Sequence, residues 1–223
     1  MGVFAKDTGG GDYTPTPEGT FVARCVQFIE LGHLYNGTFG TAAHKIQLGF
    51  EVLDDTLRYK DKEGQLMYPL ISREFTLSLS SKSNLRPTLE SWRGKTFTPE
   101  ELKGFDVTKV VGAPCMLAVV HKESGEKTYA NISAIMAPPG AMVVPEATRP
   151  LLIYEIEMRE GGTWNQLSEW TQKKISESTE FTAKSGQVAQ DRNGQAIKTV
   201  AEDPESVNNP ESPNFVPKST LPF

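Results

Sequence analysis

The segment between residues 45 and 52 alternates strictly between two kinds of side chain. One set of alternate positions is apolar throughout, namely Ile46, Leu48, Phe50 and Val52. The positions between them are Lys45, Gln47, Gly49 and Glu51. Successive side chains of a β-strand point to opposite faces of its sheet, so this pattern predicts a strand with one buried face. It favours a β-sheet as the framework of the chain.

Four further segments are predicted to be strands, because they are rich in β-branched, aromatic and other strand-forming residues. They span residues 20–29, 71–79, 115–121 and 128–136. A Gly-containing hairpin connection over residues 122–127 joins the last two. Residues 32–43, between the first two strands, are expected to form a loop.

Two helices are predicted between the third and fourth strands. Leu85, Leu89 and Trp92 recur at helical spacing between a candidate N-cap at Ser83 and a C-terminal Gly94. A second, short helix starts at the sequence Thr98-Pro99-Glu100-Glu101, which fits a capping box. The order β-β-β-α-β-β predicts a mainly β protein. The expected fold is a five-stranded OB barrel with a helical insert between strands 3 and 4.

The composition along the chain predicts four regions. Residues 1–19 are rich in Gly and Pro and are expected to be a flexible arm, and residues 20–142 the OB-fold domain. Residues 143–182 are predicted to be an appended helical segment, whose amphipathic helix over residues 164–177 docks on the barrel. Residues 183–223 are polar, net acidic and rich in Pro, so we expect a disordered tail.

Enzyme chemistry finds little support in the sequence. Gly9-Gly10-Gly11 lacks both the preceding strand and the following Lys-Ser/Thr of a phosphate loop. The three histidines and two cysteines lack metal-ligand spacing, and no nucleophile–base pair stands out. We therefore expect a protein without enzymatic activity, cofactor or metal. Cys25 and Cys115 each lie in an apolar run, which fits buried thiols in a reducing compartment. No apolar stretch approaches membrane-spanning length, so we expect no membrane partner.

Three stretches of the chain resemble a known family. They are Ser83-Asn84-Leu85-Arg86 with residues 89–95, Phe97-Thr98-Pro99-Glu100-Glu101-Leu102 with Gly104-Phe105-Asp106, and Thr128-Tyr129-Ala130-Asn131-Ile132. Followed by a Trp-containing helix, this series resembles the OB-fold single-stranded-DNA-binding proteins of tailed bacteriophages. The resemblance covers roughly residues 18–181. It implies a protein of the bacterial host cytoplasm that coats single-stranded DNA in replication or recombination.

Non-specific binding of single strands needs cations for the phosphates and aromatic faces for the bases. The candidate aromatic and polar contacts are Tyr35 and Phe39 in the first loop, Tyr129 and Asn131 on the outward parity of the fifth strand, and Trp92. Core packing is the favoured role for Trp92, because it shares helical spacing with Leu85 and Leu89. The candidate cations are Lys45, Arg73, Lys82, Arg86, Arg93, Lys122 and Lys127.

The chain ends in Leu221-Pro222-Phe223. An aromatic ring beside the α-carboxylate, after an acidic and Pro-rich segment, suits capture by a partner's pocket. It resembles the tail tip of bacterial single-stranded-DNA-binding proteins, although Lys218-Ser219-Thr220 stands where those tips carry Asp. We expect the tripeptide to recruit replication or recombination proteins. Two alternatives remain open, a β-rich phage assembly protein with a docking tail and a strand-annealing recombination mediator. The oligomeric state is not predicted.

Overall fold

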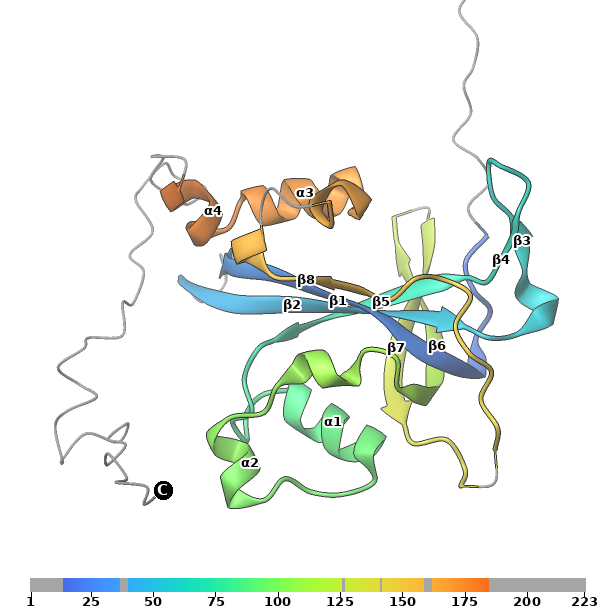
Figure 1. Cartoon of the computed structure of the whole chain (residues 1–223), viewed down its shortest axis with the longest axis horizontal. Coiled ribbons are helices and arrows are strands. Elements are labelled where there is room, and N and C mark those ends of the chain that lie inside the picture. The colour runs from blue at the N-terminus through green and yellow to red at the C-terminus, as the bar shows by residue number, and fades with distance from the viewer. Residues whose placement is uncertain (1–13, 37–39, 126, 141, 159–161, 185–223) are drawn as a thin grey trace, which may run out of the picture.

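A long first strand organises the fold in the computed structural model, which describes residues 14–36, 40–125, 127–140, 142–158 and 162–184 (Figure 1). This strand, β1 (Gly19–Asn36), pairs antiparallel with β2 (Thr41–Val52) along most of its length. Its other edge is shared, because Gly19 to Arg24 pair with β6 (Pro114–Ser124) and Gln27 to Ile29 pair in parallel with β8 (Leu152–Tyr154).

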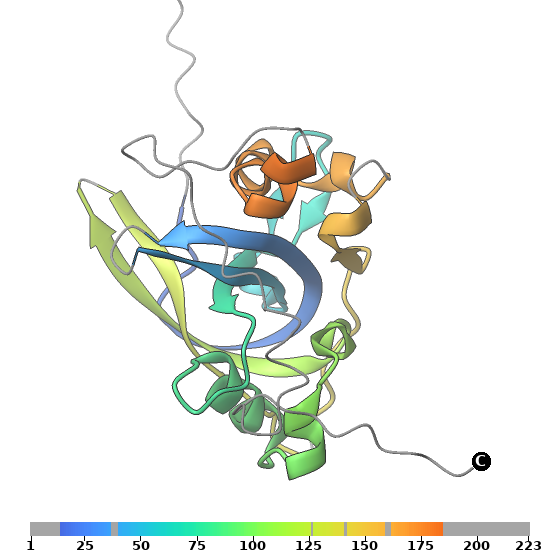
Figure 2. The ribbon, with the colours of Figure 1, turned by 90° about the vertical axis from the view of Figure 1, so that its left-hand side faces the viewer.

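The main sheet has the strand order β5-β2-β1-β6-β7, with β8 attached to β1. β5 (Leu70–Thr76) pairs with β2, and β7 (Lys127–Met136) pairs with β6. Register shifts interrupt β1 after Cys25 and after Glu30. Such irregularities bend a strand, and Figure 2 shows β1 curving strongly.

The sheet is open between its end strands, β5 and β7, because the hydrogen-bonded ladder stops at each of them. One side chain bridges the opening. Arg73 of β5 donates from Nη1 to the backbone oxygen of Ser133 on β7, at 3.2 Å. The mainly β class predicted from the alternating segments is confirmed, and the strands of the main sheet pair antiparallel apart from β8.

The main core lies inside the curved sheet. The four alternating apolar residues predicted to face inward, Ile46 to Val52, are all fully buried. The helix α1 (Leu85–Arg93) adds Leu85, Leu89 and Trp92 to this core, and the Trp92 ring lies 5.6 Å from that of Phe50. The short helix α2 (Pro99–Lys103) carries the capping box predicted at Thr98. With the 3₁₀ helix η2 (Val107–Val110), these helices lie below the sheet in Figure 1.

A second cluster packs against the opposite face of β1. It joins Ile29 and Leu31 to residues of β8, of the 3₁₀ helices η3 (Ile156–Met158) and η4 (Trp164–Gln166), and of α3 (Glu169–Ser176). The helix α4 (Thr179–Lys184) adds Phe181. Figure 1 shows α3 and α4 above the sheet. The 3₁₀ helices and helices of residues 156–184 therefore pack on this face of β1. The 3₁₀ helix η1 (Asp55–Leu57) and a ribbon of β3 (Tyr59–Lys60) and β4 (Leu66–Met67) connect β2 to β5.

Several boundaries differ from the sequence-based expectation. The loop predicted over residues 32–43 is mostly strand, because pairing from His33 with His44 to Asn36 with Thr41 extends the β1–β2 hairpin. The β6–β7 hairpin likewise extends into residues 122–127, with Ser124 opposite Lys127. In contrast, β5 ends at Thr76, three residues early.

The single helix predicted over residues 164–177 is divided. Ser168 is extended and its hydroxyl accepts from the Thr171 N–H, so it caps α3 as a separate helix after η4.

Part of the predicted N-terminal arm contacts β6. The Thr16 oxygen lies 2.9 Å from His121 Nε2, and the Glu18 carboxylate accepts from the His121 N–H. Residues 1–13 and 185–223, which include most of the arm and nearly all of the predicted tail, lie outside the described residues.

Candidate nucleic-acid interface

Three of the predicted cationic residues line one hollow of about 290 Å³ beside β5. Lys45 comes from β2, Arg73 from β5 and Lys82 from the segment between β5 and α1. The remaining lining is mostly polar, and it consists of Glu74, Phe75, Thr76, Ser78, Ser80, Ser83 and Asn84. A hollow that combines cationic groups with hydroxyl donors is suited to an anion.

The Ser-rich segment after β5 forms one wall of this hollow. Leu77 still donates its N–H to His44 O at 2.8 Å, although the strand has ended. The Ser80 N–H then donates to Ser78 Oγ, and the Leu85 N–H donates to Ser83 Oγ at 3.1 Å. Side-chain hydroxyls thus accept from the backbone in this turn, as Ser residues commonly do. The N-cap position of α1 is Asn84 rather than the predicted Ser83, and Asn84 makes no side-chain capping hydrogen bond, although Ser83 Oγ accepts from the N–H of the first helical residue.

Lys45 and Arg73 are held by neighbouring groups. Lys45 lies on the outward parity of β2 and donates from Nζ to Thr76 Oγ1 at 2.8 Å. The Arg73 guanidinium carbon lies 5.0 Å from the centre of the Phe75 ring. Partial burial lowers the pKa of Arg73, yet an arginine stays protonated at neutral pH. Both residues therefore bring a positive charge to the hollow.

An exposed aromatic ring is linked to this hollow through a lysine side chain. Trp170 of α3 is 60% exposed, and Lys174 Nζ lies over its ring, 4.8 Å from the centroid. Lys174 also forms an ion pair with Glu74, which lines the hollow. Trp170 belongs to the segment predicted to form one amphipathic helix, but the residues that α3 buries are Thr171 and Ile175. The available signal was the four-residue spacing of these two positions, which leaves Trp170 to one side.

Other predicted contacts lie away from the hollow. Tyr129 is 44% exposed on β7 and stands opposite Lys122 of β6, while Asn131 and Lys127 are exposed on the same hairpin. The outward parity predicted for Tyr129 and Asn131 is thus confirmed. Tyr35 is half-buried near the end of β1, opposite Ala42. Phe39 lies outside the described residues.

Three candidates from the insert have structural contacts instead. Trp92 is buried, and its Nε1 donates to Pro114 O at 2.7 Å, so its ring is not available to a base. The Arg93 guanidinium pairs with Glu101 and lies over the rings of Phe97 and Phe105. Arg86 Nε pairs with Glu90 one turn away, at 3.1 Å. Arg86 and Arg93, predicted as DNA contacts, are thus engaged in ion pairs within the insert. Trp92 has the core-packing role that the sequence favoured for it.

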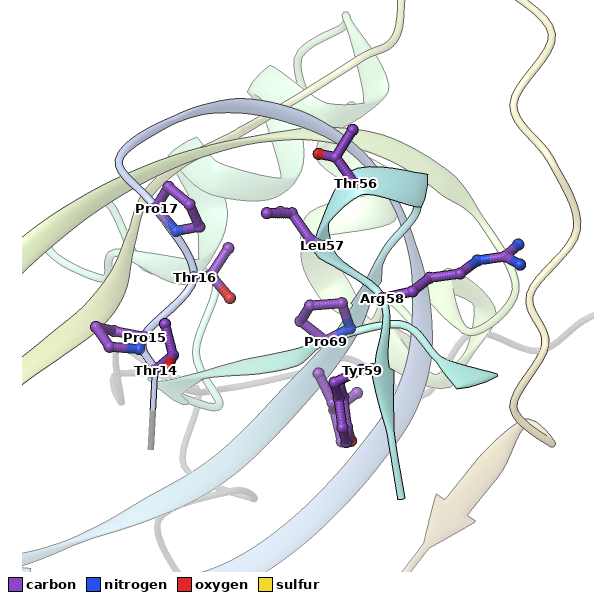
Figure 3. A pocket seen from close by; sticks show the side chains of 10 residues that line it. Thr14, Pro15, Thr16, Pro17, Thr56, Leu57, Arg58, Tyr59 and Pro69 are labelled. Carbon is purple, nitrogen blue, oxygen red and sulfur yellow. The ribbon is translucent and has the colours of Figure 1, made fainter. Parts of the chain in front are cut away.

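A larger hollow of about 620 Å³ lies elsewhere, between the segment before β1 and the segment around η1 (Figure 3). Pro15, Pro17, Leu57, Tyr59 and Pro69 contribute to its mainly apolar lining. In Figure 3 the Arg58 guanidinium points away from Pro15 and Pro17, and it pairs with Asp55. This hollow lacks the converging cations of the first one and contains none of the predicted DNA contacts.

The two cysteine thiols are buried. Burial raises the pKa of the Cys25 thiol to about 12 and raises that of Cys115 as well. Nowhere in the described ranges do three or more His, Cys, Asp or Glu side chains gather in a way that would hold a metal ion. Among the same residues, no helix combines the length and the apolar character that a membrane crossing requires.

Comparison of the sequence with protein-family models and with curated protein sequences gives no match. Function is therefore inferred from the hollow beside β5, from the exposed aromatic rings and from the arrangement of the strands.

Proposed function

We propose that this protein binds and coats single-stranded DNA without strong sequence preference during phage DNA replication or recombination. The observation that carries the proposal is the hollow in which Lys45, Arg73 and Lys82 converge with Ser and Thr hydroxyls. A phosphate group offers the charge and the acceptor oxygens that such a lining would satisfy.

The strand arrangement supports the finer fold assignment, a five-stranded OB barrel. Numbered along the chain without the short ribbon, the main strands follow the order 3-2-1-4-5, with the helices α1 and α2 between the third and the fourth. The Arg73 bridge from β5 to β7 joins the two strands that would close such a barrel. OB folds commonly bind oligonucleotides on their surface strands and adjoining loops.

The proposed mechanism separates two kinds of contact. Phosphates bind the cationic hollow and release their counterions, which provides affinity that is independent of sequence. Bases stack on exposed aromatic rings such as Tyr129, because every base has a π-face. We propose no catalytic step and no cofactor for this activity.

The C-terminal tripeptide Leu221-Pro222-Phe223 lies outside the described residues, and its role remains part of the proposal. It would recruit replication or recombination proteins in the host cytoplasm. Removal of Phe223 alone should leave DNA binding unchanged and abolish capture of such a partner from a host extract. A pull-down that is unchanged by this truncation would argue against recruitment by the tripeptide.

The test of DNA binding compares a poly-dT oligonucleotide with a duplex and with RNA. Affinity for the single strand should fall strongly between about 50 and 200 mM salt, and duplex should bind far more weakly. Equal affinity for duplex and single strand would contradict the proposal. No binding at low salt would favour the assembly-protein alternative, and an annealing assay would identify a strand-annealing mediator.

A further inference from the structure

Trp170 is unusual among the three tryptophans of the chain. Trp92 is buried in the core, and Trp164 packs against the rings of Tyr154 and Phe181, with centroids at 5.8 and 5.7 Å. Trp170, in contrast, is 60% exposed. A single exposed apolar side chain is common on protein surfaces, so the neighbours of Trp170 decide whether it marks a binding site.

The position of the Trp170 ring is set by a chain of contacts that reaches the cationic hollow. Lys174 lies one turn further along α3 and holds its ammonium group over the indole. The same ammonium group pairs with Glu74 of β5, and Glu74 lines the hollow. Lys174 and Glu74 therefore link the ring to the hollow that contains Lys45, Arg73 and Lys82.

We propose that Trp170 is a base-stacking platform, and that α3 is part of the DNA-binding surface rather than only a support for the sheet. This inference rests on the proposed function. Lys174 covers one side of the indole, and the exposed fraction of the side chain leaves the remainder open to a ligand. A nucleotide whose phosphate occupies the hollow would place its base against the open side, where stacking tolerates any base.

The surroundings of Trp170 favour a nucleotide over an apolar partner. Glu169 and Lys173 flank it on α3 and are exposed and charged, and Lys174 is cationic. An isolated ring between charged groups provides little area for a hydrophobic interface. The same ring beside positive charge provides the two features of a single-strand site, a stacking face and an electrostatic attraction for phosphate.

The test uses the intrinsic tryptophan fluorescence of the full-length protein during titration with a poly-dT oligonucleotide. Binding should quench the emission of Trp170 more than that of the two packed tryptophans. Trp170→Phe should remove most of the quenching and retain near-normal affinity measured with a labelled oligonucleotide, because Phe keeps a stacking face. Trp170→Ala should weaken binding roughly 5- to 100-fold, the range expected from loss of one base–aromatic stack.

Tyr59→Ala is the matched control, since Tyr59 is a 47% exposed aromatic residue on the separate β3–β4 ribbon. It should leave DNA affinity unchanged. If wild-type protein binds poly-dT and Trp170→Ala binds equally well with an unchanged circular-dichroism spectrum, the stacking role is wrong and the proposed function stands. If wild-type protein does not bind poly-dT at low salt, both fail.

Discussion

Arg24 and Glu51 are direct partners in the β1–β2 ladder, and each uses its side chain to hold the same connecting segment. Arg24 donates to the backbone oxygens of Val144 and Pro145, at 3.1 and 3.0 Å. Glu51, which is fully buried, accepts from the backbone N–H and the hydroxyl of Thr148, at 2.8 and 2.6 Å. The two residues thus fix the chain that leads from β7 to β8.

Glu51→Ala should destabilise the protein strongly. The fully buried Glu51 carboxylate pairs with Arg149 Nε at 3.6 Å, and its loss would remove the acceptor of the Thr148 N–H and the ion-pair partner of the partly buried Arg149. Removal of one partner from a buried ion pair typically costs about 3–5 kcal/mol in the free energy of unfolding. Urea denaturation measures this change. Glu123→Ala, at an exposed position on β6, is the control and should change little. Equal stability of the two variants would contradict this role of Glu51.

The double variant Lys45→Ala, Lys82→Ala should bind single-stranded DNA less tightly and with a weaker salt dependence. Each phosphate contact contributes about 0.7 to the slope of log K against log salt for single strands, so the slope should fall by roughly 1.4. Lys62→Ala with Lys103→Ala removes the same charge from exposed positions outside the hollow and serves as the control. If both double variants lost the same affinity and slope, the hollow would have no special role.

Lys174→Ala should weaken DNA binding, and the additional change Glu74→Ala should restore much of the loss. Lys174 neutralises a carboxylate that lines the hollow, so its removal would leave a negative charge next to the bound phosphate. A double-mutant cycle of oligonucleotide affinities measures the coupling. If the double variant bound as weakly as Lys174→Ala alone, Lys174 would act through the DNA or through the Trp170 ring instead.

Lowering the pH should weaken the hydrogen bonds that join the β1–β2 hairpin to the appended helices. The hydrogen bond with His44, at 2.7 Å, together with the Ile156 N–H, lowers the pKa of Glu30 despite burial. Burial would raise the pKa of Glu180, but its hydrogen bonds with the His33 ring and N–H outweigh this and lower it.

Because the pKa of each carboxyl is lower in the folded state, its contribution to stability is complete above the ordinary Glu value of about 4.3 and is lost as pH falls through the folded value. The free energy of unfolding, measured from about pH 7 to about pH 3, should therefore decline below that point. The variant Glu30→Gln, Glu180→Gln should be less stable at neutral pH and show a shallower decline. An identical pH profile would mean that these carboxyls do not contribute.

Local sequence patterns account for most of the secondary structure. The alternation from Ile46 to Val52 determines which side chains of β2 face the main core, because side-chain direction in a strand depends on parity. It did not show that Gln47 and Glu51, on the other face, are buried as well. The cap at Thr98 and the left-handed Gly94, with φ of 66°, mark the helices of the insert in the same local way. These features need only neighbouring residues, and the sequence alone determined them.

The site depended on contacts between distant residues. Lys45 and Lys82 meet in one hollow because β2 pairs with β5, whereas Arg93 is drawn to Glu101 and the insert aromatics. Trp170 is exposed because α3 packs on β1 through Ile175. The amphipathic pattern of this helix did not by itself specify which of its side chains would face β1. Periodicity specifies the faces of each element but not the partner that each face meets. Only the tertiary structure decided which charges converge and which aromatic ring remains accessible.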